Sequence, residues 1–146
     1  MIKFPAAEPL FAYDYQLRSR YSETDMMGVV HHGHFVDYFE EARTEMIREL
    51  GMPYADMEKS GVGMPVVNLE IDYKESIFYD ELINIRILLF KMPTARLRTW
   101  YEVSTAENGR MKALARVDLC FMDMKSGRPV RAPENFQARL KGAMAI

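Results

Sequence analysis

The sequence predicts one α+β domain in which a single antiparallel sheet curls around one long helix. Three features support this: one amphipathic stretch with a helical period, several stretches with a period of two, and a hairpin signal late in the chain. A flat sheet would leave part of the apolar helix face uncovered, whereas a curled sheet shares one core with it. The 146 residues are about one domain in length and contain no repeat or linker, so we expect a single domain over residues 1–146.

The first elements are a lead-in, a strand and a helix. Residues 1–12 include two prolines, which predicts a loose lead-in. Tyr13 to Tyr21 alternates in polarity and predicts a strand, and a polar loop follows. The helix is indicated by apolar residues at steps of three and four, which are Phe35, Phe39, Ala42, Met46 and Leu50. The helix is expected to end at Gly51, because glycine adopts the left-handed conformation that ends many helices.

The second half of the chain has the period of strands. Four stretches alternate in polarity, centred on residues 67–74, 83–89, 96–105 and 113–121, and we expect them to form an antiparallel meander. Asn108–Gly109 separates the last two, and both residues tolerate positive φ, as a tight hairpin requires. Residues 54–60 are expected to form a short turn or helix, and residues 135–142 a short helix or a tail.

Composition excludes several classes of function. The net charge is −2, whereas nucleic-acid-binding domains usually carry an excess of Lys and Arg. One cysteine, Cys120, leaves no intramolecular disulfide and no cysteine-based zinc cluster. The sequence contains no apolar run of bilayer-spanning length and does not begin like a secretory signal. We therefore expect a cytoplasmic protein without nucleic-acid partners and without membrane insertion.

The stretch from Tyr21 to Arg43 carries the candidate chemistry. A polar loop precedes the helix, and a helix start presents unpaired backbone N–H groups with partial positive charge. Such a position can stabilise an oxyanion. Asp25 lies just upstream, where its carboxylate can activate water or attack a carbonyl. Gly28 allows the backbone to approach a bound group closely.

The same residues have simpler interpretations. Asp25 is also suited to capping its own loop, and Glu40 to a solvated helix face. The cluster of His31, His32 and His34 allows a zinc site with a nearby carboxylate, but two of its members are adjacent and the sequence has no other histidine. We expect no metal.

This stretch resembles a known family. Its residues follow the motif of hotdog-fold acyl-CoA thioesterases of the 4-hydroxybenzoyl-CoA thioesterase type, and most closely the branch associated with the Tol–Pal cell-envelope locus. The matching residues are Tyr21, Thr24, Asp25, Gly28, Val29, Val30 and His32, then Phe39, Glu40, Ala42, Arg43, Thr44 and Glu45. The resemblance continues more weakly from about Tyr15 to Phe136. It departs at Glu23, where the family has aspartate, and at His34 and Phe35, where it has asparagine and tyrosine.

The resemblance implies a mechanism. The family fold is a long antiparallel sheet wrapped around a central helix, and its members are dimers or tetramers with active sites at the subunit interface. By this resemblance, Asp25 is the nucleophile or general base, and the backbone N–H of His32 polarises the thioester carbonyl. The His32 side chain orients substrate or water, and Gly28 lines the loop near the thioester. The expected reaction releases a carboxylic acid and coenzyme A, and it needs no cofactor.

The resemblance also implies where the substrate lies. Val29 and Val30 are candidate walls of the slot for pantetheine and the acyl chain. Coenzyme A is strongly anionic and the chain is slightly acidic overall, so local cations are needed. The candidates, in segments that approach the nucleotide in relatives, are Lys91, Arg96, Arg128 and Arg131.

Other functions on the same fold remain open at this point. The chain fits an acyl-carrier-protein thioesterase, or a hydratase or dehydratase of acyl thioesters that uses His32 with Glu40. Within the thioesterases, Glu40 is also the second candidate for the catalytic acid. A protein that binds an acyl thioester without cleaving it is the non-enzymatic alternative.

Overall fold

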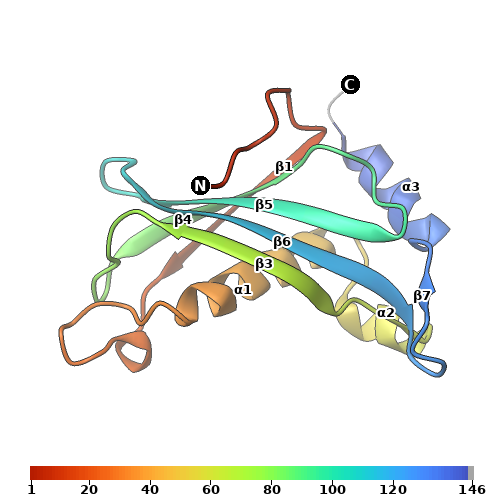
Figure 1. Ribbon diagram of the computed structural model, residues 1–146, viewed down its shortest axis with the longest axis horizontal. Coiled ribbons are helices and arrows are strands. Elements are labelled where there is room, and N and C mark those ends of the chain that lie inside the picture. The colour runs from red at the N-terminus through yellow and green to blue at the C-terminus, as the bar shows by residue number, and fades with distance from the viewer. Residues whose placement is uncertain (145–146) are drawn as a thin grey trace.

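The computed structural model describes residues 1–144 and has the predicted architecture, one antiparallel sheet curled around the long helix α1 (His34–Glu49) (Figure 1). Within these residues the strands are β1 (Phe11–Arg18), β2 (Val62–Gly63), β3 (Val66–Tyr73), β4 (Leu82–Leu89), β5 (Arg96–Thr105), β6 (Met111–Asp123) and β7 (Pro129–Val130). The sheet runs in the order β1-β4-β5-β6-β2, and β3 and β7 also pair with β6.

The central helix forms where the apolar spacing predicts it. Phe35, Phe39, Ala42 and Met46 are at most 2% exposed, and they face the inward side chains of the sheet. The Phe39 ring packs against Tyr101 of β5 with 4.6 Å between ring centroids. Burial of this face is the main force that holds the helix inside the curled sheet, because each fully buried large apolar side chain contributes roughly 1.5–3 kcal/mol.

The strand pairing differs from a simple meander. β4, β5 and β6 pair in sequence order, and the turn at Asn108–Gly109 joins β5 to β6 with Gly109 at φ +73°. β3, however, pairs with β6 rather than β4, and β1 takes the place beside β4. Alternating polarity indicates which face of a strand is buried but not which strand lies beside it. As a result β3 is an edge strand, and it exposes Val66, Val67, Leu69 and Tyr73.

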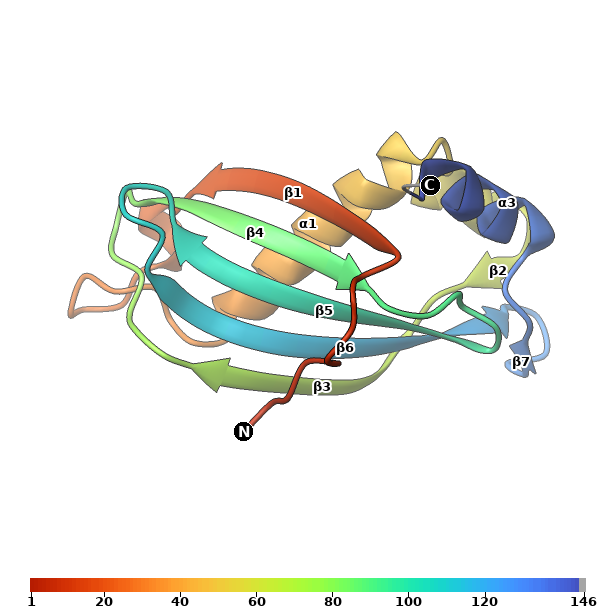
Figure 2. The same ribbon diagram turned by 90° about the horizontal axis from the view of Figure 1, so that it is seen from above.

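The chain before the helix also departs from expectation. β1 begins at Phe11 and ends at Arg18, and a 3-10 helix, η1 (Tyr21–Glu23), takes the place of the predicted end of that strand. The residues before β1 cross the outer face of the sheet (Figure 2). There the Phe4 ring lies 5.0 Å from the Trp100 ring, and the Ile2 N–H donates to Asp72 at 2.7 Å. The lead-in is therefore held against the sheet.

Two short helices cover the end of the sheet at which α1 finishes. They are α2 (Tyr54–Lys59) and α3 (Glu134–Ala143), and both views place them opposite the loop that precedes α1 (Figures 1 and 2). α3 buries Phe136 against Phe121 of β6 at 5.6 Å between ring centroids. Among residues 1–144, no helix combines the length and apolar character needed to cross a bilayer.

Candidate active site

The loop before α1 is a tight hairpin over residues 24–30, closed at its base by an antiparallel bridge. The N–H of Asp25 donates to the carbonyl of Val29 at 2.8 Å, and the N–H of Gly28 donates back to the carbonyl of Asp25 at 3.0 Å. Gly28 has φ +78°, a conformation that strains residues with a Cβ atom. Gly28 thus shapes the turn that fixes the place of Asp25, and its predicted close approach to a bound group stays a prediction.

The Asp25 side chain is exposed, and only one of its two carboxylate oxygens accepts hydrogen bonds within the described chain. Its Oδ1 accepts the N–H of Met27 at 2.8 Å and, weakly, the N–H of Val29 at 3.4 Å. Within the described chain Oδ2 has no hydrogen bond and no ion pair. The carboxylate therefore caps its own turn with one oxygen and keeps the other available. It lines a hollow of 630 Å³ together with Tyr21, Thr24, Met26, Gly28 and Tyr79.

The start of α1 leaves one amide without an acceptor. The N–H of His31 donates to the Glu23 carbonyl, and that of His34 donates to the His31 carbonyl, both at 2.9 Å. The N–H of Gly33 donates to Nδ1 of His31 at 3.1 Å. From residue 29 to residue 36, the N–H of His32 is the single backbone donor without a partner in the described structure. This is the amide that, by the family resemblance, is expected to polarise the thioester carbonyl.

His32, the residue that carries this amide, is held by two hydrogen bonds to its own carbonyl. The carbonyl of His32 accepts the Tyr73 hydroxyl at 2.8 Å and the N–H of Phe35 at 3.3 Å. Tyr73 ends the edge strand β3, and its ring meets that of Phe35 edge-on at 5.1 Å. A second hollow, of 270 Å³, lies here and is lined by Val30, His32, Phe35, Tyr73, Lys74, Glu75 and Ser76. Within one chain, Asp25 and His32 thus border two separate hollows.

The hairpin rests on the connection between β3 and β4, residues 74–81. The N–H of Val30 donates to the Ile77 carbonyl at 2.7 Å, and Val29 forms a bridge with Phe78. Val30 is buried and lines the hollow beside His32, whereas Val29 is half-buried within this backbone pairing. Of the two valines predicted as slot walls, Val30 is the one that borders a hollow.

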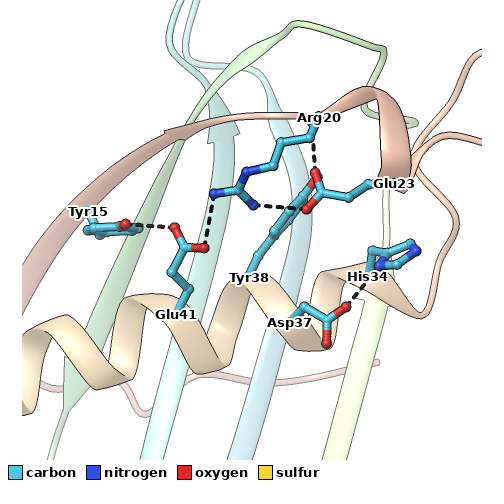
Figure 3. A network of polar contacts seen from close by, with 7 residues as sticks. All are labelled: Tyr15, Arg20, Glu23, His34, Asp37, Tyr38 and Glu41. Atoms are coloured by element: carbon cyan, nitrogen blue, oxygen red, sulfur yellow. Dashed lines mark hydrogen bonds and ion pairs between the residues drawn. The ribbon is translucent and has the colours of Figure 1, made fainter.

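A polar network, buried at Glu23 and Tyr38 and exposed at Arg20, supports the foot of the hairpin (Figure 3). The Glu23 carboxylate accepts the Tyr38 hydroxyl of α1 at 2.6 Å and the Arg20 guanidinium at 3.0 Å. Arg20 also pairs with Glu41 of α1 at 3.1 Å, and Glu41 accepts the Tyr15 hydroxyl of β1 at 2.6 Å. Burial, and then the hydrogen bond to Glu23, raise the pKa of Tyr38 far above its ordinary value of 10.0. Tyr38 therefore remains a neutral donor to Glu23.

The other candidate groups have different surroundings. His34 pairs with Asp37 at 2.8 Å, and Nδ1 of His31 accepts a backbone N–H. Among residues 1–144, no three His, Cys, Asp or Glu side chains form a group suited to a metal ion. Glu40, the second candidate acid, is exposed on α1.

The four predicted coenzyme A contacts lie far from Asp25 in the same chain. Lys91, in the connection between β4 and β5, and Arg96, at the start of β5, line a common cavity of 470 Å³, and Arg128 and Arg131 flank β7. β4 starts at the hairpin end of the sheet and has 8 residues, so roughly 26 Å of strand separates its two ends. One chain alone does not bring these cations to the hairpin.

Sequence reasoning missed two polar contacts at the site. Tyr73 donates its hydroxyl to a residue 41 positions away, and no local pattern predicts such a contact. Glu23 was visible only as a departure from the family motif, and the sequence gives no sign that its carboxylate is buried under the hairpin. Both contacts depend on how β3 and α1 meet in three dimensions.

Comparisons with known proteins agree with this structure. The sequence profile of a family described as the thioesterase-like superfamily matches residues 19–140. YneP of Bacillus subtilis strain 168 is 40% identical over 87 residues, which are 60% of this chain and 54% of that protein, so the chain spans about half of that relative. A Haemophilus influenzae protein named acyl-CoA thioesterase YbgC is 28% identical over 127 residues, covering 86% of this chain and 92% of that protein.

A solved structure of a DHNA-CoA thioesterase from Staphylococcus aureus superposes with a TM-score of 0.77 and 36% identity, covering 82% of this chain and 80% of that one. These findings confirm the predicted resemblance, the hotdog fold and the assignment to the thioester hydrolases. The chain belongs to the thioesterase-like superfamily.

Proposed function

We propose that the protein hydrolyses an acyl-CoA thioester to a free carboxylic acid and coenzyme A. The observation that carries the proposal is the N–H of His32 at the start of α1, which has no acceptor among residues 1–144 and lies next to the hairpin that holds Asp25. Preorganised N–H donors aimed at a developing oxyanion are among the largest contributions to catalysis of acyl transfer. In this proposal the His32 N–H binds the thioester oxygen as it gains negative charge.

Asp25 supplies the second part of the reaction. As a nucleophile, its carboxylate attacks the carbonyl carbon, the C–S bond breaks, and the resulting anhydride is hydrolysed by water. As a general base, it takes a proton from water while the water oxygen attacks the same carbon. In both routes coenzyme A leaves as a thiol or thiolate, and water is the only co-reactant. The Oδ2 atom of Asp25, which has no partner among residues 1–144, and the solvent exposure of the side chain support either role.

A pair of subunits joined along β3 offers a complete site. β3 is an edge strand with an exposed apolar surface, which favours pairing with another strand. Antiparallel pairing of two copies would set the Tyr73 end of one β3 beside the Val66 end of the other. The proposed homodimer, alone or within a tetramer, thereby brings the end that carries Lys91 and Arg96 toward the hairpin of the second subunit.

The acyl group is proposed to occupy the hollow beside His32. Val30, Phe35 and Tyr73 give it an apolar and aromatic lining, and Lys74 lies at its edge. A panel of short, medium, long and aromatic acyl-CoA substrates, with detection of the released thiol, tests this assignment. Matched acyl-carrier-protein thioesters in the same panel separate the two carrier classes.

Asp25→Asn against Glu40→Gln is the decisive comparison. Loss of a positioned base or nucleophile typically lowers turnover by about 100-fold or more, so we expect that fall for Asp25→Asn. Glu40→Gln should retain turnover within about threefold. The reverse result would move the catalytic acid to α1, and near wild-type turnover in a folded Asp25→Asn variant would reject Asp25.

Two outcomes of the panel would replace the proposal itself. Hydration of an enoyl-CoA without thioester cleavage would indicate a hydratase that uses His32 and Glu40. Tight acyl-CoA binding without any turnover, in protein shown to be folded by circular dichroism, would indicate a binding protein.

A further inference from the structure

The network in Figure 3 joins the foot of the hairpin to α1 and, through Arg20 and Glu41, to β1. Glu23 lies at the foot of the hairpin, where its carbonyl accepts the N–H of His31 from the other side of the loop. The Glu23 side chain accepts the hydroxyl of Tyr38, which lies one turn into α1. Glu23 therefore lies before Asp25 in the chain and contacts His31 and Tyr38, which stand on either side of the His32 amide.

The carboxylate of Glu23 is buried and fully used. Its side chain is 9% exposed, and its two oxygens accept the Tyr38 hydroxyl, the backbone N–H of Arg20 and the Arg20 guanidinium. Hydrogen bonds to ionised groups are about twice as strong as neutral ones, and a buried carboxylate requires such partners. The contact between hairpin and helix therefore consists of strong, fully partnered hydrogen bonds.

We propose that Glu23 is a positioning residue that, through Tyr38 and its own backbone carbonyl, sets the distance between Asp25 and the His32 amide. The inference rests on the proposed hydrolysis for its kinetic readout. It adds a function for Glu23, one of the positions at which this chain departs from the family motif. The longer glutamate side chain reaches the Tyr38 hydroxyl and the Arg20 guanidinium together.

The structure provides a matched pair of variants. Tyr38→Phe removes the hydroxyl that binds Glu23, and Tyr15→Phe removes the hydroxyl that binds Glu41 in the same network. Both variants lose one oxygen atom and one hydrogen bond to a carboxylate. Tyr38 acts on the foot of the hairpin, whereas Tyr15 joins β1 to α1 without contact to the hairpin.

The first measurement is hydrogen exchange of the backbone amides of residues 23–33, which needs no substrate. In Tyr38→Phe we expect the protected amides of Asp25 and His31 to exchange at least about fivefold faster, because the hairpin opens locally more often. Tyr15→Phe should leave them within about twofold of wild type. Equal acceleration in both variants, or in neither, would overturn the proposal.

The second measurement is turnover on the best substrate of the panel, at a temperature at which both variants are folded. A misplaced reacting group lowers the chemical step more than binding, so Tyr38→Phe should reduce kcat about tenfold with KM within about twofold. Tyr15→Phe should retain both constants. Unchanged kcat in Tyr38→Phe would contradict the positioning role even if its exchange is faster.

Glu23→Gln tests the residue itself. The amide keeps one acceptor oxygen for Tyr38 but presents an NH₂ group to the Arg20 donors, so kcat should fall at least as far as in Tyr38→Phe. If Glu23→Gln does not fold, the tyrosine pair still decides the question. If wild-type protein cleaves no thioester, the proposed function fails. The hydrogen-exchange comparison of the two tyrosine variants still tests whether Glu23 and Tyr38 hold the hairpin against α1.

Discussion

At the end of α1 that faces α2 and α3, the chain buries Phe121, Phe136 and Leu140 at 0–1% exposure. At the opposite end, the hairpin exposes Met26 fully and Met27 at 85%, and the His32 N–H has no partner in the described chain. Apolar packing closes one end of the fold, whereas hydrogen bonds and ion pairs position the other. This contrast teaches that the proposed chemistry lies at the end of the helix where polar contacts position the chain, while apolar burial continues along the whole helix face.

The contrast between the two ends is tested most directly by a substitution that should lower stability without lowering activity. Phe136→Ala removes a fully buried ring and should lower the free energy of unfolding by about 3–5 kcal/mol. Turnover per folded molecule should stay within about twofold, because the change is at the end of α1 away from the hairpin. Urea unfolding and kcat, measured on the same samples, check both expectations.

Asp25→Asn is the matched control at the other end. An exposed loop substitution of equal size should change the free energy of unfolding by at most about 0.5 kcal/mol while it removes turnover. If Phe136→Ala also lowered the turnover of folded molecules by tenfold or more, the two ends would be coupled and the separation would be wrong.

Tyr73→Phe sharpens the contrast at the edge strand. The variant loses the hydrogen bond to the His32 carbonyl, which holds the residue that carries the free amide. Such a bond contributes roughly 1 kcal/mol, so kcat should fall about fivefold with a stability loss near 1 kcal/mol. Kinetics on the panel substrate and urea unfolding give the two values.

Tyr13→Phe serves as the control for that variant. Tyr13 is on β1, and burial, followed by the charge of Glu49 at the end of α1, raises its pKa. Its hydroxyl thus belongs to the far end of the helix, and its removal should leave kcat within about twofold. An equal loss of kcat in both variants would mean that tyrosine hydroxyls act through general stability.

Periodicity predicted the layers of the fold better than the order of its strands. The helical spacing of Phe35, Phe39, Ala42 and Met46 is enough to define the buried face, because only that face can meet a sheet. The pairing of β3 with β6 depends on contacts between residues more than 40 positions apart, such as Leu69 with Val117. Local patterns contain no information about such a choice.

For the candidate site, too, the sequence predicted the candidate residues but not the contacts that support them. The motif predicts Asp25, Gly28 and His32 as site residues, and the structure shows a turn with positive φ at Gly28 and, among residues 1–144, no acceptor for the His32 amide. The supports, Tyr38 and Tyr73, looked like ordinary core and strand residues in the sequence. Their hydroxyl partners are 15 and 41 positions away, so only the folded chain shows the contacts.

The smallest expected effect is a pH dependence of stability from the polar network. Burial, the hydrogen bond to Glu41 and the charge of Glu41 raise the pKa of Tyr15 from 10.0 to about 12. The unfolded chain therefore loses this proton first as pH rises. The contribution of Tyr15 is fully present below about pH 10 and is lost between about pH 10 and pH 12.

Urea midpoints measured from pH 9 to pH 11.5 test this sign. Wild type should lose stability above pH 10 more steeply than Tyr15→Phe, which has no phenol to ionise at that position. Tyr79→Phe is the control, because its hydroxyl is exposed and makes no hydrogen bond within the described residues. If Tyr15→Phe and Tyr79→Phe flattened the profile equally, the network around Glu41 would not hold the Tyr15 proton, and the polar end of α1 would be less constrained than its contacts indicate.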